Sequence, residues 1–507
     1  MSGSSRWILL TAVAVFALVS VLYAPVLGHE LRSDDFQWVQ QAHRAQVEPA
    51  QLFADLDSFY RPLNTWSLLV DRVIWGSNPA GYHLTNLFLH MLAALGLAVA
   101  ARRVGLSSIA SSVVAVVWAA SPFTEEAAIW ISARFQDFLM IGWTGMIAAW
   151  PRKGEEWTPW RWAAVLAALF VGAASKESWV VMPALGAVLE FHRTDGSLKR
   201  VARTVAPLLL LSTIYVAGYF VAFPGDKDYY NWSLAVLAKL PHMFASFLYF
   251  EELMPMGFVL GWRSILATLA VSAGVVYGLR RRSLPIAVGA VWIGLSALPV
   301  ILVAFLPTRH TMIPYAGFLL IVAAYFEQLA AETPARWRPI VPFGMAGMVA
   351  LVVLAGAAVV RADMVDYGRV SKATTQLLAE TREVLPHLAF DQPLIVVRGE
   401  NSSPLHQVTV NPHGRIKIWY PRHADPYGLV DTAALFDWTQ AQQASPVERV
   451  DDWQERLSGV PGWLLVHREG GFVLPAQPVD DVAGEARRWQ EAGHRFRVVM
   501  NGTDVPD

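Results

Sequence analysis

Apolar segments long enough to cross a lipid bilayer recur through residues 1–360 of this 507-residue chain. A helix needs about 20 mostly apolar residues to span the hydrocarbon core of a membrane. Charged residues make up only 16% of the sequence, whereas an ordinary soluble domain carries roughly 25%. These features predict a polytopic α-helical membrane protein.

Eleven segments are predicted to span the membrane, and two of them are short. The segments 161–174 and 178–191 are too short to cross comfortably alone, so a pair of short helices meeting in a buried turn is the alternative. The apolar stretch 234–250 is predicted to lie as an amphipathic helix at the interface, with a further span as the alternative. The predicted spans are 7–27, 82–101, 106–121, 128–149, 161–174, 178–191, 204–223, 264–279, 284–305, 311–329 and 340–360.

Basic residues set the expected orientation, because loops rich in arginine and lysine stay in the cytoplasm. With a cytoplasmic N-terminus, every inner loop is basic, and an odd number of spans puts everything after Arg361 outside. The expected location is a bacterial inner or cell membrane. The basic residues of the inner side are Arg6, Arg102, Arg103, Arg152, Lys153, Arg161, Arg193, Lys199, Arg200, Arg203, Arg280, Arg281, Arg282, Arg336 and Arg338.

The composition becomes that of a soluble protein beyond the last predicted span. Residues 1–360 are predicted to form the membrane domain, and residues 361–507 a small α/β domain on the outer side. Helices are expected over 364–388, 447–458 and 481–492. Strands are expected at 394–397, 407–410, 415–419, 463–466 and 496–500.

Composition also disfavours several function classes. The net charge of −1 provides no overall basic field that would attract nucleic acid. Cysteine is absent, which excludes disulfides, thiolate catalysis and zinc sites built from cysteine. Membrane lipids are therefore the expected surroundings.

Paired carboxylates occur in two predicted outer loops. Asp34 and Asp35 directly follow the first span, and Glu125 and Glu126 follow the third. A carboxylate so placed can take a proton from an acceptor hydroxyl or hold a divalent metal such as Mg²⁺ or Mn²⁺. No cofactor is assigned, and Asp35 and Glu126 are the candidate ligands if a metal binds. Solvated loop carboxylates are the alternative.

Cations share the outer side with these carboxylates. Lys176 and Glu177 lie in the turn between the two short predicted helices, and interrupted helices with charged turns can mark a site within a membrane. Arg309 lies at the end of the ninth span, and arginine suits phosphate because its planar group donates two hydrogen bonds at once. A snorkelling lysine and an interfacial arginine are the alternatives.

Polar side chains also fall within predicted spans. Charges at membrane depth are usually paired or face a cavity, and the i,i+3 spacing of Arg134 and Asp137 predicts a structural pair as the alternative to a functional role. His83, Asn86 and His90 share one helix face. Hydrogen bonds between packed helices are expected for them, because no further ligands complete a zinc site.

Together these residues suit a transfer reaction. A base activates an acceptor hydroxyl while cations stabilise an anionic leaving group. A lipid phosphate in that role has a low pKa and needs no general acid. Stabilisation of the leaving group's charge then contributes more to catalysis than proton donation does.

Six short motifs resemble, in order and spacing, the GT-C class of multi-span glycosyltransferases, which use polyprenyl-phosphate-linked sugars. The nearest pattern is the membrane part of the transmembrane and tetratricopeptide-repeat O-mannosyltransferases. The motifs cover residues 30–320, about the first two-thirds of the chain. They are SDDF at Ser33 to Phe36, YRPL at Tyr60 to Leu63, YHLTNLFLH at Tyr82 to His90, SPFTEEAAIWISAR at Ser121 to Arg134, SKES at Ser175 to Ser178 and LPTRHTMIPYAG at Leu306 to Gly317.

The resemblance implies roles for particular residues. Asp34 or Asp35 would be the catalytic base, and Glu126 would belong to the second acidic motif. Lys176 and Arg309 would face the lipid phosphate, with Arg134 as a further candidate. The residues assigned to the donor or acceptor site without individual roles are Arg61, His83, Glu125, Glu177 and His310.

Several positions depart from the family pattern. Ala133 stands where the family has glycine, the Arg-x-Asp spacing is stretched to Arg134 and Asp137, and His310 follows Arg309 where tyrosine is usual. No tetratricopeptide repeats follow the membrane part, so a protein-O-mannosylating role is not implied.

The favoured hypothesis is an inverting glycosyltransferase. It would move a hexose, with mannose as the candidate, from a polyprenyl-phosphate donor to a glycan, lipid or protein acceptor on the outer face. A transporter or flippase for a lipid-linked substrate is the first alternative, although the halves show no repeat symmetry and the charges gather on one side. A non-catalytic assembly subunit is the second.

Overall fold

The computed structural model places the chain in two compact units. One comprises residues 1–24, 58–64 and 83–362, and the other comprises residues 25–57, 65–82 and 363–507. The predicted strands 407–410 and 415–419 lie outside the described residues. The structure describes residues 3–32, 34–54, 56, 59–222, 233–249, 261–303, 308–334, 336, 340–384, 392–398, 447–449, 453–468 and 471–501.

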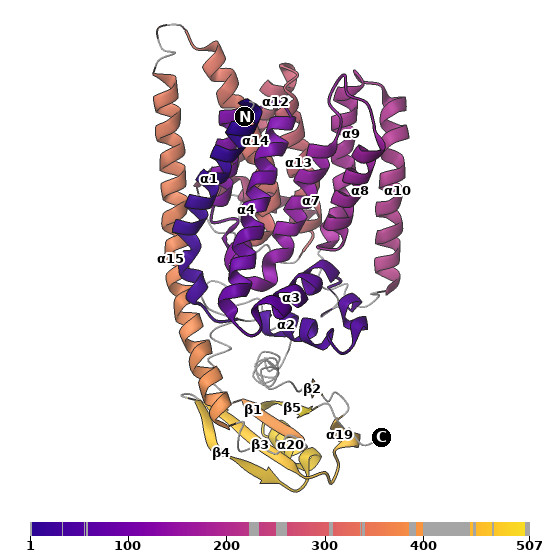
Figure 1. Ribbon diagram of the computed structural model, residues 1–507, viewed down its shortest axis with the longest axis vertical. Coiled ribbons are helices and arrows are strands. Elements are labelled where there is room, and N and C mark those ends of the chain that lie inside the picture. The colour runs from indigo at the N-terminus through magenta and orange to yellow at the C-terminus, as the bar shows by residue number, and fades with distance from the viewer. Residues whose placement is uncertain are drawn as a thin grey trace. The chain divides into compact units, whose positions relative to one another are not determined.

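Helices dominate the first unit (Figure 1). Among the described residues, seven are long and apolar enough to cross a membrane, and the chain is therefore an integral membrane protein. Each of the seven coincides with a predicted span. They are α1 (Gly3–Tyr23), α4 (Pro79–Arg103), α10 (Leu198–Ala222), α12 (Trp262–Arg280), α13 (Leu284–Ile301), α14 (Met312–Glu332) and α15 (Val341–Val384).

The other four predicted spans form shorter helices. The segment 128–149 does not form one helix, because the chain is extended at Trp130, and α6 (Glu125–Ile129) and the 3-10 turn η3 (Ile131–Arg134) precede α7. Lengths of 12 to 15 residues are too short to cross a bilayer alone. The four are α5 (Ser108–Ala119), α7 (Phe135–Ala149), α8 (Pro159–Ala173) and α9 (Met182–Arg193).

Glycines bring two helix pairs of this unit close together. A Cβ atom on Gly289 of α13 would lie 2.6 Å from the carbonyl oxygen of Gly317 on α14, and one on Gly317 would lie 2.8 Å from that of Gly289. A Cβ on Gly142 of α7 would lie 2.9 Å from the Ala168 oxygen of α8. Small residues allow such contacts, which drive helix association in membranes.

Four short elements lie between the long helices around the candidate site. The 3-10 turn η4 (Glu177–Val181) follows α8, and η6 (Thr308–Thr311) precedes α14. The stretch predicted as an interfacial helix forms η5 (Leu234–Ala238) and α11 (Lys239–Tyr249).

The second unit begins with elements from the first long loop. A 3-10 turn, η1 (Ala24–Gly28), follows α1, and α2 (Asp35–Arg44), η2 (Pro49–Phe53) and α3 (Pro62–Trp75) come next. The Trp66 indole nitrogen donates to the Leu52 carbonyl oxygen at 3.1 Å, which ties α3 to η2.

The same unit contains a five-stranded sheet of order β2-β5-β1-β3-β4. β1 and β3 are parallel, with Ile395 opposite Leu464, and the other neighbouring pairs are antiparallel. One apolar core joins Ile395, Leu464, Val498 and Val482 of α20. The elements are β1 (Leu394–Arg398), β2 (Val447–Arg449), α19 (Trp453–Arg456), β3 (Gly462–Arg468), β4 (Gly471–Val479), α20 (Val482–Glu491) and β5 (Arg495–Asn501).

Most predicted elements of the tail agree with these strands and helices. The strands at 394–397, 463–466 and 496–500 and the helix at 481–492 are confirmed. The helix predicted over 447–458 is wrong in its first part, because Val447–Arg449 pairs with β5 as an edge strand. The strand β4 was not predicted.

Candidate functional site

A cavity of about 190 Å³ lies among helices α10 and α13 and the turns η4 and η6. Five residues from the predicted motifs line it, and the rest of its wall is mainly apolar and aromatic. The lining residues are Phe59, Arg61, Lys176, Glu177, Ser178, Val180, Tyr215, Val216, Tyr219, Pro299, Val300, Leu302, Val303 and His310.

The chain brings the YRPL and SKES motifs together at the end of α8. The Lys176 backbone N–H donates to the Gly172 oxygen at 3.0 Å, which closes the last turn of the helix. The Leu63 N–H donates to the Ala174 oxygen at 2.8 Å. This backbone bond places Arg61 beside Lys176 and Glu177.

Arg61 is held by a carboxylate and by two rings. Its Nε lies 3.4 Å from Glu177 Oε1, and its Nη2 lies 3.5 Å from Oε2. The guanidinium carbon lies 3.9 Å from the Phe135 ring centroid and 4.3 Å from that of Phe59. The charge of Arg61 is therefore balanced within the protein.

Lys176 differs from Arg61 in its contacts. Its side chain is buried, yet among the described residues its ammonium makes no hydrogen bond or ion pair. Its aromatic contact is the Phe135 ring, with Nζ 5.3 Å from the centroid. Burial, followed by the nearby Arg61 guanidinium, lowers the pKa of Lys176 well below its usual value. An anion entering the cavity would favour the charged form.

Arg309 forms a second buried ion pair close to the cavity. Its Nη1 donates to Glu126 Oε2 at 2.9 Å, and its guanidinium carbon lies 5.0 Å from the Trp130 ring centroid. Gln136 Nε2 donates to the Arg309 backbone oxygen at 3.2 Å and fixes η6 against α7. The predicted carboxylate Glu126 and the predicted cation Arg309 thus contact each other.

Two polar residues of α4 hydrogen-bond to the segment that carries Glu126 and to α7. Asn86 Nδ2 donates to the Ala127 oxygen at 3.3 Å and to the Trp130 oxygen at 3.0 Å, where the chain leaves α6. His90 Nδ1 lies 3.1 Å from Asp137 Oδ1, and both side chains are fully buried. The expected packing role of Asn86 and His90 is confirmed.

The pair predicted between Arg134 and Asp137 is wrong. Asp137 pairs with His90, and Arg134 Nε donates to the Ile131 oxygen at 3.3 Å. The i,i+3 rule requires a continuous α-helix, whereas residues Ile131–Arg134 form a 3-10 turn before α7 begins. Arg134, Glu125 and His83 are all buried.

The first acidic motif belongs to the second unit. Asp35 begins α2, is fully buried, and accepts a hydrogen bond from the Arg32 backbone N–H at 3.1 Å. Asp34 precedes the helix and is half-buried. A carboxylate at a helix N-terminus is favoured by the helix dipole.

A metal site would need several oxygen or nitrogen ligands close together. In the part of the chain that the structure describes, no group of three or more histidine, aspartate or glutamate side chains is placed to hold a metal ion. Glu126 instead binds Arg309, and Asp35 binds backbone. In the described part of the chain, Glu126 and Asp35 therefore do not come together as ligands of a metal centre.

Lys239 is a site neighbour that the sequence interpretation missed. Its ammonium donates to the Ile301 oxygen at 3.0 Å and to the Val303 oxygen, where α13 ends beside the cavity. Lys239 is buried and is the only charged residue of the run 234–250. An isolated charge in an apolar run was the signal that could have identified it.

Comparisons with known proteins complete the description. No protein-family model and no curated protein matches the sequence. The chain is similar to the solved structure of ArnT from Cupriavidus metallidurans bound to undecaprenyl phosphate, at 12% identity and a TM-score of 0.49, with 100% of each chain covered. It is also similar to the oligosaccharyltransferase of Archaeoglobus fulgidus tethered with an acceptor peptide, at 14% identity and a TM-score of 0.46, over 70% of this chain and 54% of that one.

These solved structures are of the GT-C class that the sequence motifs resemble. Their TM-scores are too low to carry an argument about what this chain does. That argument therefore rests on the residues of the cavity itself.

Proposed function

We propose that this protein is a GT-C glycosyltransferase that moves a sugar from a polyprenyl-phosphate donor to an acceptor on the outer face of the membrane. The observation that carries the proposal is the buried Lys176 side chain, which lines the cavity and makes no hydrogen bond or ion pair among the described residues. A buried cation is costly unless an anion joins it. A phosphate in the cavity would be that anion.

The charges around the cavity support this choice of ligand. Among the charged residues that line the cavity, Arg61 pairs with Glu177, so Lys176 is the surplus positive charge there; Arg309, beside the cavity, pairs with Glu126. A sugar phosphodiester carries one negative charge, which this surplus would neutralise. The apolar wall formed by residues such as Val300 and Val303 suits the adjoining isoprenoid chain.

The reaction would be a single displacement at the anomeric carbon of the sugar. The acceptor hydroxyl oxygen forms a bond to that carbon while the bond to the phosphate oxygen breaks, which inverts the configuration. Lys176 and Arg309 stabilise the negative charge that develops on the departing phosphate. The lipid phosphate leaves without a proton because its pKa is low.

Asp34 is the proposed base that takes the hydroxyl proton. It is half-buried, so an acceptor can reach it, whereas Asp35 is fully buried and accepts a backbone N–H. Asp35 would then be a positioning residue that holds the turn before α2. The donor sugar is proposed to be a hexose such as mannose, and the acceptor a glycan, lipid or protein.

The test compares Lys176→Met with a matched control, Lys199→Met, at an exposed position on α10. Purified full-length protein is titrated with undecaprenyl phosphate, and transfer from polyprenyl-phosphate mannose to membrane extract is measured. Loss of one electrostatic contact to a developing charge typically costs about 10²–10³-fold in rate. We expect that loss, and weaker lipid binding, in Lys176→Met alone.

Two further variants separate chemistry from binding. Asp34→Asn is expected to bind undecaprenyl phosphate normally and to lose transfer. If Asp34→Asn and Asp35→Asn both keep full transfer, the proposed base is wrong. Unchanged lipid binding and transfer in Lys176→Met would refute the phosphate site. Lipid movement in liposomes without any acceptor would instead favour a flippase.

A further inference from the structure

A second cavity, of about 300 Å³, lies at the other end of the helices in the same unit. It is formed by the turn after α4, the loop between α7 and α8, and the end of α9. Helix α8 begins next to this cavity and ends just before Lys176, so its 15 residues, roughly 22 Å, separate the two cavities. Six cationic or titratable side chains line the second cavity: Arg102, Arg103, Arg152, Lys153, His192 and Arg193.

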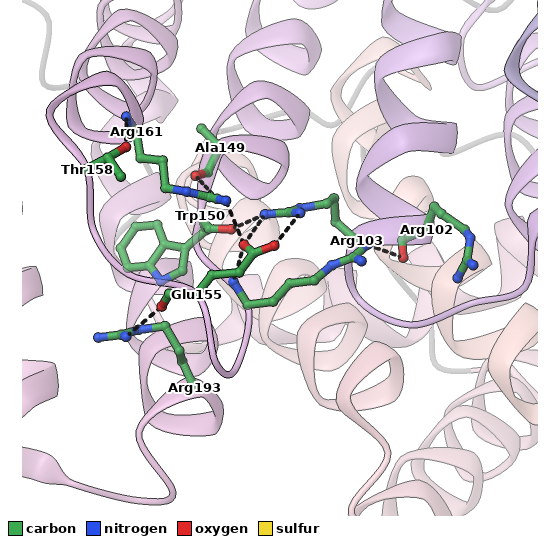
Figure 2. A network of polar contacts seen from close by, with 9 residues as sticks. Arg102, Arg103, Ala149, Trp150, Glu155, Thr158, Arg161 and Arg193 are labelled. Carbon is green, nitrogen blue, oxygen red and sulfur yellow. Dashed lines mark hydrogen bonds and ion pairs between the residues drawn. The ribbon is translucent and has the colours of Figure 1, made fainter. Parts of the chain in front are cut away.

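A single carboxylate, Glu155, joins several cations beside this cavity (Figure 2). Arg103 Nη2 lies 3.1 Å and Arg161 Nη2 lies 2.7 Å from Glu155 Oε2, and the Arg152 backbone N–H donates to the same oxygen at 2.9 Å. Arg103 also donates to the Trp150 oxygen at 2.7 Å. The cations are thus held by the loop and by the carbonyl end of α7, and their geometry exists before any ligand arrives.

The positive charges are not fully balanced. Five arginine and lysine side chains line the cavity, and Arg161 lies beside it. Three carboxylates pair with them: Glu155 with Arg103 and Arg161, Glu190 with Arg193 at 2.6 Å, and Asp195 with Lys153 at 2.6 Å. Arg102 and Arg152 are exposed, and their side chains donate to backbone oxygens rather than to carboxylates. These two guanidinium groups are therefore the ones available to bind an anionic ligand.

Partial burial of Arg152 and the like charges near it support the same conclusion. Burial, followed by the neighbouring Arg103 guanidinium, lowers the pKa of Arg152. An anion between the arginines would relieve this repulsion. Phosphate fits the donor set, because guanidinium groups bind its oxygens in pairs.

Tryptophans place this end of the unit at the level of lipid head groups. The Trp157 ring stacks on Trp162 with centroids 4.1 Å apart and meets Trp150 edge-on at 5.0 Å. Trp160, at the start of α8, is 84% exposed. Tryptophan gathers where membrane and water meet, and basic pockets between membrane helices bind anionic lipid head groups.

We propose that this basic cavity binds the phosphodiester head group of an anionic membrane phospholipid, with Arg102 and Arg152 contacting the phosphate. The bound head group would link the turns after α4, α7 and α9. This site is separate from the proposed catalytic cavity, and the inference does not depend on the proposed function.

The test uses purified full-length protein in neutral detergent, titrated with phosphatidylglycerol and followed by native mass spectrometry. Phosphatidylcholine is the uncharged reference, and sodium phosphate is a competing arm. The variant is Arg102→Gln/Arg152→Gln, and the matched control is Lys199→Gln/Arg200→Gln, which removes two exposed charges outside the cavity.

We expect phosphatidylglycerol to bind more tightly than phosphatidylcholine, and about 30-fold more weakly to the double variant, from roughly 1 kcal/mol for each basic residue. The control should bind like the unaltered protein. The single variant Arg152→Gln, which keeps the Arg103–Glu155 contact, should lie between them. Equal binding by the variants and the unaltered protein would overturn the site. Full competition by millimolar sodium phosphate would overturn a lipid as its source.

Discussion

Two of the four cations at or beside the candidate cavity carry their own carboxylates. Arg61 binds Glu177 and Arg309 binds Glu126, while Lys176 has no such partner in the described part of the chain. A buried ion pair is worth little compared with an apolar pair of similar size, but removing one partner is costly. The carboxylates therefore hold the arginines in place.

The Glu126–Arg309 pair gives a test that separates stability from activity. Glu126→Gln leaves Arg309 buried without its carboxylate and is expected to destabilise the protein by about 3–5 kcal/mol. Glu126→Gln/Arg309→Gln should recover most of that loss, yet it should not recover transfer. The measurements are the thermal midpoint of the purified protein and the transfer rate.

An exposed ion pair serves as the control for this change. Arg281 binds Glu332 at 2.9 Å, with side chains 57% and 46% exposed. Glu332→Gln should change stability by less than about 1 kcal/mol, because solvent screens such pairs. If the double variant is no more stable than Glu126→Gln, then Arg309 does not depend on Glu126 in the way described.

Helix packing controls where the site residues lie. Arg309 and His310 occupy η6, between α13 and α14, and these two helices cross at Gly289 and Gly317. The position of the cations therefore depends on how closely two backbones approach. The position of Lys176 depends in the same way on where α8 ends.

Gly317→Ala tests this dependence. The added methyl group would lie 2.8 Å from the Gly289 oxygen, so α13 and α14 must move apart. Overpacking of this kind costs about 1–3 kcal/mol. We expect a lower thermal midpoint and weaker binding of undecaprenyl phosphate.

Gly294→Ala is the matched control on α13, because nothing lies within 4 Å of the position its Cβ would occupy. Alanine should there be neutral or stabilise the helix by up to about 1 kcal/mol. Equal behaviour of the two alanine variants would show that the crossing does not control the site.

At the scale of the whole molecule, orientation remains the central prediction. Basic loops predict that the turn between α7 and α8 is cytoplasmic and that the loop after α1 and the C-terminal sheet are outside. The sequence contains no cysteine, so a single introduced thiol reports its own side of the membrane without background.

We expect Gln46→Cys and Gln490→Cys to react with an impermeant maleimide on intact cells, and Glu156→Cys to react only after permeabilisation. All three positions are exposed on the described structure. Labelling is read as the mass shift of the protein. If Gln490→Cys is protected while Gln46→Cys reacts, an odd number of crossings separates them, and the stretch around α11 becomes a candidate span.

Long helices were predictable from the sequence, whereas contacts between distant residues were not. Hydropathy located α4 and α14 because a bilayer demands a continuous apolar run. The Glu126–Arg309 pair joins residues 183 positions apart, and local spacing carries no information about it. Asp137 shows that local spacing can also mislead. Spacing offered Arg134 as its partner, whereas in the fold Asp137 pairs with His90 of another helix.

The surplus charge that Lys176 adds to the cavity lining has a consequence for the order of events after the proposed transfer. The donor is a phosphodiester, but the polyprenyl phosphate left behind is a monoester that carries close to two negative charges at neutral pH. Lys176 would balance the first and not the second, so holding the spent carrier would need a second cation, either Lys239 from its carbonyl partners or an arginine from its carboxylate. If the proposed function holds, we therefore expect departure of that carrier, rather than bond cleavage, to limit turnover.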